Sequence, residues 1–176
     1  QLGLCSMMLN LPTEPNLVDV VRAKERLDEA LLRELTLKHE CGLHVIGAPA
    51  DAVRASEVDD PSFTRVLSLA RRTFDYLIVD TFPAVDPMLI ASLDASDLVY
   101  ILLQGTVPNT IGISRFLPVI DGLRVARERQ RVVLNLNHAQ VAAALTPADI
   151  ERQIDRPTSY VLPYTKGILR ALNKGV

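Results

Sequence analysis

The sequence has only two cysteines and no hydrophobic run long enough to cross a bilayer, and each shortage excludes a class of protein. Cys5 and Cys41 stand far apart and outside any C-x-x-C pair, so the chain is not a disulfide-stapled scaffold. Few and unpaired cysteines are typical of proteins of the reducing cytoplasm. The longest apolar runs are far shorter than the roughly 20 residues that a membrane-spanning helix needs. We therefore expect a cytoplasmic protein that associates with membranes only through partners.

The sequence also lacks a strong excess of charge of either sign. Its 19 basic and 21 acidic residues give a formal net charge of -2, so no global field attracts nucleic acid or anionic lipid. The densest basic run, RVARERQR at 124–131, contacts phosphates in one interpretation. In the other it is the solvated end of a helix, where arginines offset the helix dipole. No aromatic residues interleave with it to stack on bases, and we expect no specific nucleic-acid partner.

A glycine-rich loop for phosphates is missing as well. Neither G-x-x-x-x-G-K-[ST] nor G-x-G-x-x-G occurs, and the glycines stand alone. Motifs of other chemistries are equally sparse. Cys41 and His44 form C-x-x-H, but no second pair stands at zinc spacing, so a structural role is favoured. Ser114 does not lie in a G-x-S-x-G elbow, so the sequence shows no hydrolase nucleophile.

What the sequence does contain is an alternation of apolar strands and amphipathic helices. The 176 residues, 48% hydrophobic and 23% charged, are enough for one globular domain spanning 1–176. Continuously apolar strands that alternate with helices predict an α/β fold with a mostly parallel sheet and helices on both faces. The expected strands are 42–49, 75–80, 97–104, 131–137 and 158–164. The expected helices are two short ones within 17–37, then 60–74, 86–96, 108–129, 146–154 and 166–174.

One carboxylate stands at the end of the most strand-like segment. The run FDYLIVD ends in Asp80, and a short turn with two prolines follows. A rigidly held carboxylate at a strand end can orient the water shell of a magnesium ion bound to nucleotide phosphates. The alternative is that Asp80 caps the following turn, as many strand-end aspartates do. The residue pattern by itself favours the cap.

Amide side chains follow at the ends of two later strands. Asn135 and Asn137 alternate with leucine in VVLNLN, and Gln104 ends the preceding strand. In parallel sheets ligands sit beyond the carboxyl ends of the strands, so these groups and Asp80 are expected on one rim. An amide offers a donor beside an acceptor, which suits the edge of adenine. The alternative is a pair of turn-forming residues that end the strand.

Several of these segments, taken in order, resemble the MinD/ParA-type ATPases, and most closely their CpaE/TadZ branch in Tad (Flp) pilus assembly. The similar segments are DYLIVD with its proline turn, SLDASD at 92–97, LLQGTVP at 102–108, RVVLN at 131–135 and VLPYTKGILRALNKGV at 161–176. The opening QLGLCSMMLNLPTEP is similar to the segment after the switch I aspartate of that family. The resemblance covers almost the whole chain, and the order and spacing of the motifs give it specificity.

The resemblance implies a P-loop nucleotide-hydrolase fold, MinD-like, lacking its first strands. It places the phosphate-binding lysine loop and the switch I aspartate before Gln1, so we expect 1–176 to be part of a longer protein, cut at both ends. It implies ATP and Mg²⁺ as ligands, with Asp80 orienting the magnesium through water. The turn from Thr81 to Val85 would sense the γ-phosphate, with Thr81 and Pro83 as its nucleotide-binding residues. Asn135, with Asn137 second, would contact adenine.

The resemblance also implies a homodimer formed over nucleotide, partners in pilus or secretion assembly, and a place at the cell pole or the inner face of the inner membrane. Two departures stand out. The turn DTFPAVDP lacks the glycine that MinD relatives carry, and PNTIGIS lacks a basic residue common in CpaE-like sequences. Hydrolysis of ATP is therefore an open question. The alternatives are a partitioning or positioning ATPase of the ParA or MinD type and a non-hydrolysing scaffold with the same fold.

Overall fold

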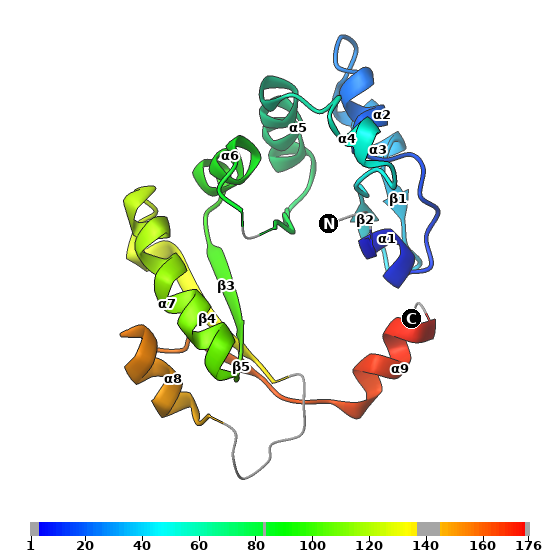
Figure 1. Cartoon of the computed structure of the whole chain (residues 1–176). Coiled ribbons are helices and arrows are strands. Elements are labelled where there is room, and N and C mark those ends of the chain that lie inside the picture. The colour runs from blue at the N-terminus through cyan, green and yellow to red at the C-terminus, as the bar shows by residue number, and fades with distance from the viewer. Residues whose placement is uncertain (1–3, 83, 137–144, 175–176) are drawn as a thin grey trace. The chain divides into compact units, whose positions relative to one another are not determined.

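The structure, a computed structural model, describes residues 4–82, 84–136 and 145–174 and divides the chain into two compact units (Figure 1). The first unit comprises residues 1–95 with 167–176, and the second comprises 96–166. Each unit is considered separately below. The single domain expected from the sequence stays a prediction.

The first unit is mostly helical, and capping side chains start its helices. Its helices are α1 (Leu4–Met8), α2 (Leu17–Arg22), α3 (Glu29–Glu34), α4 (Ala52–Ala55), α5 (Asp60–Thr73) and α6 (Pro87–Ala95), with α9 (Lys166–Lys174) at the boundary. Asn16 forms a capping box on α2, and Asp59 accepts from the Ser62 amide at 2.7 Å to start α5. Asp86 accepts from the Leu89 amide at 2.7 Å and so caps the start of α6.

The core of this unit lies between α2, α3 and α5. Val18, Val20 and Leu32 are completely buried there, and Val66 and Leu67 of α5 pack against them. These α5 side chains belong to the stripe predicted from helical spacing at 60–74. The short helices α1 and α4 were not predicted, because four or five residues carry too little periodicity to distinguish a helix from a loop.

The strand expected at 42–49 is reduced to two residues in an antiparallel hairpin. β2 (His44–Val45) pairs with β1 (Leu37–Lys38), and Gly42 takes a φ of 91° in the turn between them. A parallel bridge from Asn16 to Gly47 continues the extended chain. The structure thus has a shorter strand than expected within 42–49, paired antiparallel with the chain that precedes it.

The strand expected at 75–80 does not form a ladder with any described residue. The segment is open chain in the structure, and Tyr76 and Ile78 are 91% and 88% exposed. Apolar composition predicts which residues suit a buried strand, but a strand also needs a neighbour to accept its backbone hydrogen bonds. The correction matters because Asp80 ends this segment.

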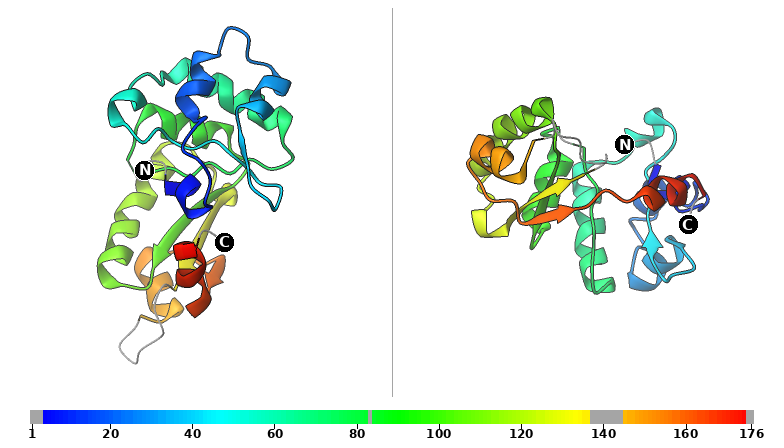
Figure 2. Two further views of the ribbon diagram at one scale, coloured as in Figure 1. Left: turned by 90° about the vertical axis from the view of Figure 1, so that its right-hand side faces the viewer. Right: turned by 90° about the horizontal axis from the view of Figure 1, so that it is seen from below.

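The second unit is a three-stranded parallel sheet with two helices on one side. β3 (Val99–Gln104), β4 (Gln130–Asn135) and β5 (Tyr160–Leu162) pair in the order β3-β4-β5, as expected for the last three strands. Figures 1 and 2 show α7 (Val107–Gly122) and α8 (Pro147–Ile154) on the same side of these strands. The core on that side comprises Ile101, Leu103, Val132, Leu134, Leu117, Ile150 and Ile154.

The other face of this sheet carries apolar side chains that the unit itself leaves exposed. Tyr100, Leu102, Tyr160 and Leu162 are each 47–56% exposed, and the rings of Tyr100 and Tyr160 lie 6.3 Å apart. Within the described residues β3 pairs only with β4, so its outer edge is open. Open edges and apolar sheet faces are normally covered in folded proteins.

The helix expected at 108–129 is shorter than predicted. α7 continues through Pro118 but ends at Gly122, and Arg124 then takes a φ of 60° before a 3-10 turn at Arg127–Arg129. The basic run at 124–131 therefore follows the helix and does not form its end, as one of the two interpretations expected. Arg127 pairs with Asp121, while Arg129 and Arg131 donate to backbone carbonyls.

Candidate functional site

Asp80 lies at the exposed end of the open segment, and its carboxylate receives one hydrogen bond from the described residues. The donor is the thiol of Cys5 in α1, whose Sγ is 3.6 Å from Oδ2 of Asp80. Partial burial, and next the negative charge of Asp80, raise the pKa of the Cys5 thiol above its ordinary value. The thiol therefore stays protonated at neutral pH and is able to donate.

The position of α1 is fixed by close contact with the chain beyond β2. A Cβ atom added at Gly47 would come within 2.5 Å of the Ser6 hydroxyl, which would have to rotate away to make room for it. Gly47 is itself held by its bridge to Asn16 and by accepting from the Leu17 amide at 2.9 Å. Ser6 is the buried residue of α1, and Cys5 beside it is exposed.

Among the described residues of the turn, no backbone amide donates to Asp80 as the cap interpretation would require. The helix that follows the turn is capped by Asp86, six residues later. Within the turn, the Ala84 amide donates to the Phe82 carbonyl at 2.8 Å, and Thr81 and Phe82 are exposed. Pro83 lies outside the described residues. From the described residues, the other carboxylate oxygen of Asp80 receives no hydrogen bond.

In the second unit, Gln104 and Asn135 lie side by side at the carboxyl ends of their strands. They are register partners on β3 and β4, and Asn135 is in turn the partner of Leu162 on β5. Register partners on parallel strands project to the same face, so the two amides lie together beside an apolar side chain. The backbone N–H of Gln104 donates to the side-chain oxygen of Asn109 at 2.7 Å and fixes this end of β3.

The sequence-based expectation that Gln104 and Asn135 converge is met within this unit. Gln104 is exposed and Asn135 half-buried, so both amides are accessible from the edge of the sheet. Asn137 lies outside the described residues. The roles assigned to Asp80, Thr81 and Asn135 stay predictions, because a position alone does not identify a ligand.

The cysteine and histidine of C-x-x-H do not meet. Cys41 instead contacts His39, with its sulfur 2.9 Å from Nδ1, while His44 contacts the Thr36 hydroxyl at 2.7 Å. Among the described residues, no group of three or more histidine, cysteine or acidic side chains could hold a metal ion. The structural role favoured by the sequence is therefore consistent with the contacts.

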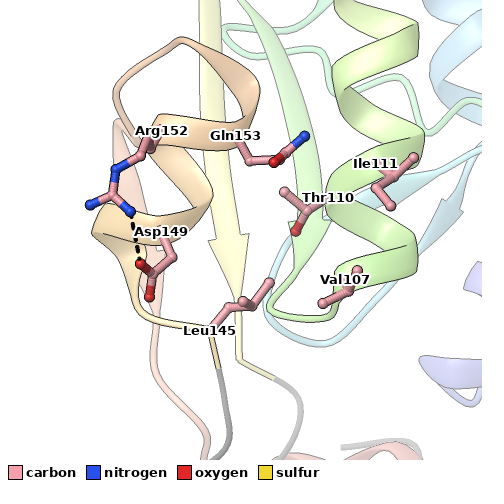
Figure 3. Close-up of a pocket in the computed structure, with 7 residues that line it drawn as sticks. All are labelled: Val107, Thr110, Ile111, Leu145, Asp149, Arg152 and Gln153. Carbon is pink, nitrogen blue, oxygen red and sulfur yellow. Dashed lines mark hydrogen bonds and ion pairs between the residues drawn. The ribbon is translucent and has the colours of Figure 1, made fainter.

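A pocket of about 340 Å³ opens between α7 and α8 (Figure 3). Its apolar side is formed by Val107, Ile111 and Leu145, and its polar side by the ion pair of Asp149 with Arg152, 3.3 Å apart. None of the predicted site residues lines it. Sequence reasoning did not identify this pocket, because it arises from the packing of two helices whose exposed residues show no motif.

A ParA-family ATPase from Chlorobium tepidum TLS superposes with a TM-score of 0.82 and 22% sequence identity, over 91% of this chain and 66% of that chain. The chain has the fold of the ParA and MinD ATPases. MinD from Pyrococcus horikoshii OT3, complexed with Mg-ADP, superposes with a TM-score of 0.77 at 13% identity, over 99% of this chain and 69% of that one.

A third similar structure is MinD in the MinC:MinD cell division complex of Aquifex aeolicus, with a TM-score of 0.71 and 16% identity, over 97% of this chain and 68% of that chain. No family model matches the sequence, and no curated protein matches it. The chain thus spans about two thirds of the length of the ATPases that it resembles. The likeness confirms the fold class expected from the sequence.

Among the described residues, no helix has both the length and the apolar character that crossing a membrane requires.

Proposed function

We propose that this chain is the larger part of a MinD/ParA-type ATP-binding protein that positions an assembly in the cell. The observation that carries the proposal is the pair of amides, Gln104 and Asn135, at the carboxyl ends of adjacent strands in a fold shared with such ATPases. In parallel α/β sheets this is the edge where ligands bind.

Magnesium is assigned to Asp80, through water. One exposed carboxylate with a free oxygen fits an ion that keeps several of its waters and takes one or two carboxylates along with phosphates. The ion supplies charge neutralisation to the phosphates when bound. Asp80 itself orients water at its oxygen, and Thr81 begins the turn proposed to respond to the γ-phosphate.

Adenine is assigned to Asn135. Its half-buried amide can donate to one base nitrogen and accept from the exocyclic amine, and Leu162 beside it offers apolar contact. Asn137 is the second candidate. Guanine presents the reverse pattern of donor and acceptor, so a fixed amide distinguishes the two bases by leaving polar groups unpaired in the wrong complex.

The phosphate-binding lysine loop is not in this sequence, and we propose that a further polypeptide segment supplies it together with a strand. The open outer edge of β3 and the unpaired, apolar segment 76–80 support the addition of a strand. The finer assignment, to the CpaE/TadZ branch with a homodimer over ATP in Tad or Flp pilus assembly, rests on the motif order described above.

The test is nucleotide binding by the natural full-length protein, with magnesium and with EDTA. Asp80→Ala is expected to weaken the magnesium-dependent affinity for ATP by about 10–100-fold, as loss of a residue that orients metal ligands does. Asp75→Ala removes an exposed carboxylate five residues earlier and should leave the magnesium-dependent affinity for ATP unchanged. Equal ATP affinity in wild type and Asp80→Ala would contradict the assignment.

Hydrolysis distinguishes the alternatives. A partitioning ATPase of the ParA type, favoured by the likeness to the Chlorobium protein, should hydrolyse ATP faster in the presence of DNA or a partner protein. A scaffold should bind ATP without turnover. Loss of ATP preference over GTP in Asn135→Ala would support the adenine contact in either case, and an unchanged preference would contradict it.

A further inference from the structure

The pocket between α7 and α8 adjoins a ridge of exposed side chains on α7 (Figure 3). Val107 and Ile111 line the pocket and are 55% and 38% exposed. Arg115 and Val119 continue the ridge at four-residue spacing, and both are exposed. We propose that the pocket and this ridge together form a groove that docks a partner protein through an amphipathic helix with apolar anchors and acidic residues beside them.

The two helices that form the groove are fixed in place. Leu117 of α7 and Ile150 of α8 are almost completely buried in the core of the second unit. The capping box of Thr146 and Asp149 fixes the start of α8. Thr110 lines the pocket, and its hydroxyl donates to the backbone one turn earlier at 2.9 Å. A partner therefore meets a surface that needs little rearrangement to bind it.

The polar groups of the groove leave positive charge available to a partner. One oxygen of Asp149 accepts from Arg152 at 3.3 Å, and the other accepts from the amide and the hydroxyl of Thr146. Arg152 uses one of its five N–H groups in this pair and is mostly exposed. Arg115 is exposed too and has no ion-pair partner among the described residues. Acidic side chains on a partner complement these two arginines.

The same polar groups do not suit a small polar ligand. In the lining of the pocket, no buried polar side-chain atom of a described residue lacks a hydrogen-bond partner. Small-ligand sites usually present a few converging polar groups that are free to bind. The groove instead offers apolar walls around about 340 Å³ with arginines beside them. A helix surface matches this arrangement, because it carries apolar and charged side chains one turn apart.

A second copy of this chain fits the groove less well than an acidic partner does. In a two-fold interface the same patch meets itself, so the arginines of one copy would face those of the other. Like charges brought together across an interface oppose binding. Nucleic acid would neutralise the arginines but offers Val107 and Ile111 no apolar side chains to pack against. A protein helix with acidic residues beside its apolar anchors satisfies both parts of the groove.

The experiment uses the natural full-length protein, with a phage-displayed library of helical peptides as the probe. Peptides selected on the immobilised protein should carry apolar residues at helical spacing with Asp or Glu beside them. Fluorescence anisotropy with the synthetic peptides measures their affinity. Ile111→Glu places a negative charge in the apolar part of the groove and should lower this affinity about tenfold or more. The control Arg124→Glu reverses an exposed arginine past the end of α7 and should bind as wild type.

Charge reversal distinguishes this docking from non-specific apolar binding. Arg115→Glu should weaken binding of the acidic peptide about three- to tenfold. The same variant should recover affinity for a version of the peptide in which lysine replaces the acidic residues. Thermal midpoints and ATP affinity should match wild type in each variant, because none of the residues proposed for nucleotide binding lines the groove. Failure of the peptide results thus leaves the proposed function as it stands.

Several outcomes overturn the proposal. The selection yields no peptides or only basic ones, the affinity of the selected peptides is unchanged in Ile111→Glu, or duplex DNA binds in a manner that depends on Arg115 and not on Ile111. Size-exclusion chromatography without nucleotide provides a further check. A wild-type dimer that Ile111→Glu dissociates would assign the groove to a second copy of the chain.

Discussion

At the scale of single residues, Ser6 carries a hydroxyl that is buried without a hydrogen-bond partner among the described residues. A buried polar group without a partner loses its hydrogen bonds to water on folding. Ser6→Ala should therefore raise the free energy of unfolding by about 1 kcal/mol. Thermal denaturation checks this, with Ser68→Ala as the control, since the exposed Ser68 hydroxyl already donates to the Thr64 carbonyl. A lower midpoint for Ser6→Ala would indicate a partner outside the described residues.

Asp121 joins three parts of the second unit through its carboxylate. Its carboxylate accepts from the Gln130 side chain at 3.0 Å and pairs with Arg127 and Arg156, tying the end of α7 to the start of β4 and the chain after α8. The hydrogen bond from Gln130, and next the positive charges of Arg156 and Arg127, lower the pKa of Asp121.

A lowered pKa in the folded state means that this carboxylate stabilises the fold above the pH range of an unfolded aspartate, about 4, and stops doing so as the pH falls through the lowered value. Asp121→Asn should lower the free energy of unfolding by about 1–3 kcal/mol at pH 7. The difference from wild type should shrink below about pH 4. Urea denaturation at several pH values measures this stability difference, and Glu128→Gln, which changes an exposed carboxylate, is the control. A difference that does not change with pH would contradict the role of the charge.

At the scale of elements, α8 begins with a capping box formed by the sequence T-P-A-D at 146–149. The Asp149 amide donates to the Thr146 hydroxyl at 3.2 Å, and the Asp149 carboxylate accepts from the Thr146 amide at 3.2 Å. Thr146→Ala should reduce stability by about 1 kcal/mol, because an amide at the helix start loses its acceptor. Thr146→Ser keeps the hydroxyl and should be close to wild type. Thermal midpoints that are equal for all three proteins would show that the cap contributes nothing.

Helices with such caps were predictable, and the strands show where prediction from sequence ends. Local signals fix α5, α6 and α8: the caps Asp59, Asp86 and Thr146 stand where apolar stripes begin. β3 and β4 were also predicted, because each finds a parallel partner within the chain. The segment 75–80 is just as apolar and forms no strand. Whether an apolar segment forms a strand depends on whether a neighbouring strand accepts its backbone hydrogen bonds. The composition of the segment does not show that neighbour.

The same distinction applies to the candidate site. The convergence of Gln104 and Asn135 follows from strand ends in a parallel sheet, so sequence order predicts it. The contact of Cys5 with Asp80 depends on how α1 packs against the chain at Gly47. No spacing rule connects residues that are brought together by irregular segments, so this contact needed the structure.

At the scale of the whole molecule, both units expose apolar surface of the kind that β-sheet proteins cover. In the first, Tyr76 and Ile78 point into solvent from a segment without a partner, and in the second, Leu102 and Tyr160 lie on a bare sheet face beside an open edge. Such surface pairs with other chains when nothing else covers it. The chain of 1–176 expressed alone is therefore expected to aggregate or to stay partly unfolded.

Size-exclusion chromatography and thermal denaturation of the chain expressed alone test this expectation. The double variant Ile78→Lys with Leu102→Lys places charge on the two exposed surfaces and should increase the soluble fraction severalfold, as charges at open edges do in natural sheets. Val53→Lys is the matched control, because Val53 is 76% exposed and lies on the short helix α4 instead of a strand. A soluble monomer of the unmodified chain with a sharp, cooperative transition would contradict the prediction, since it would show that the open edge needs no further strand.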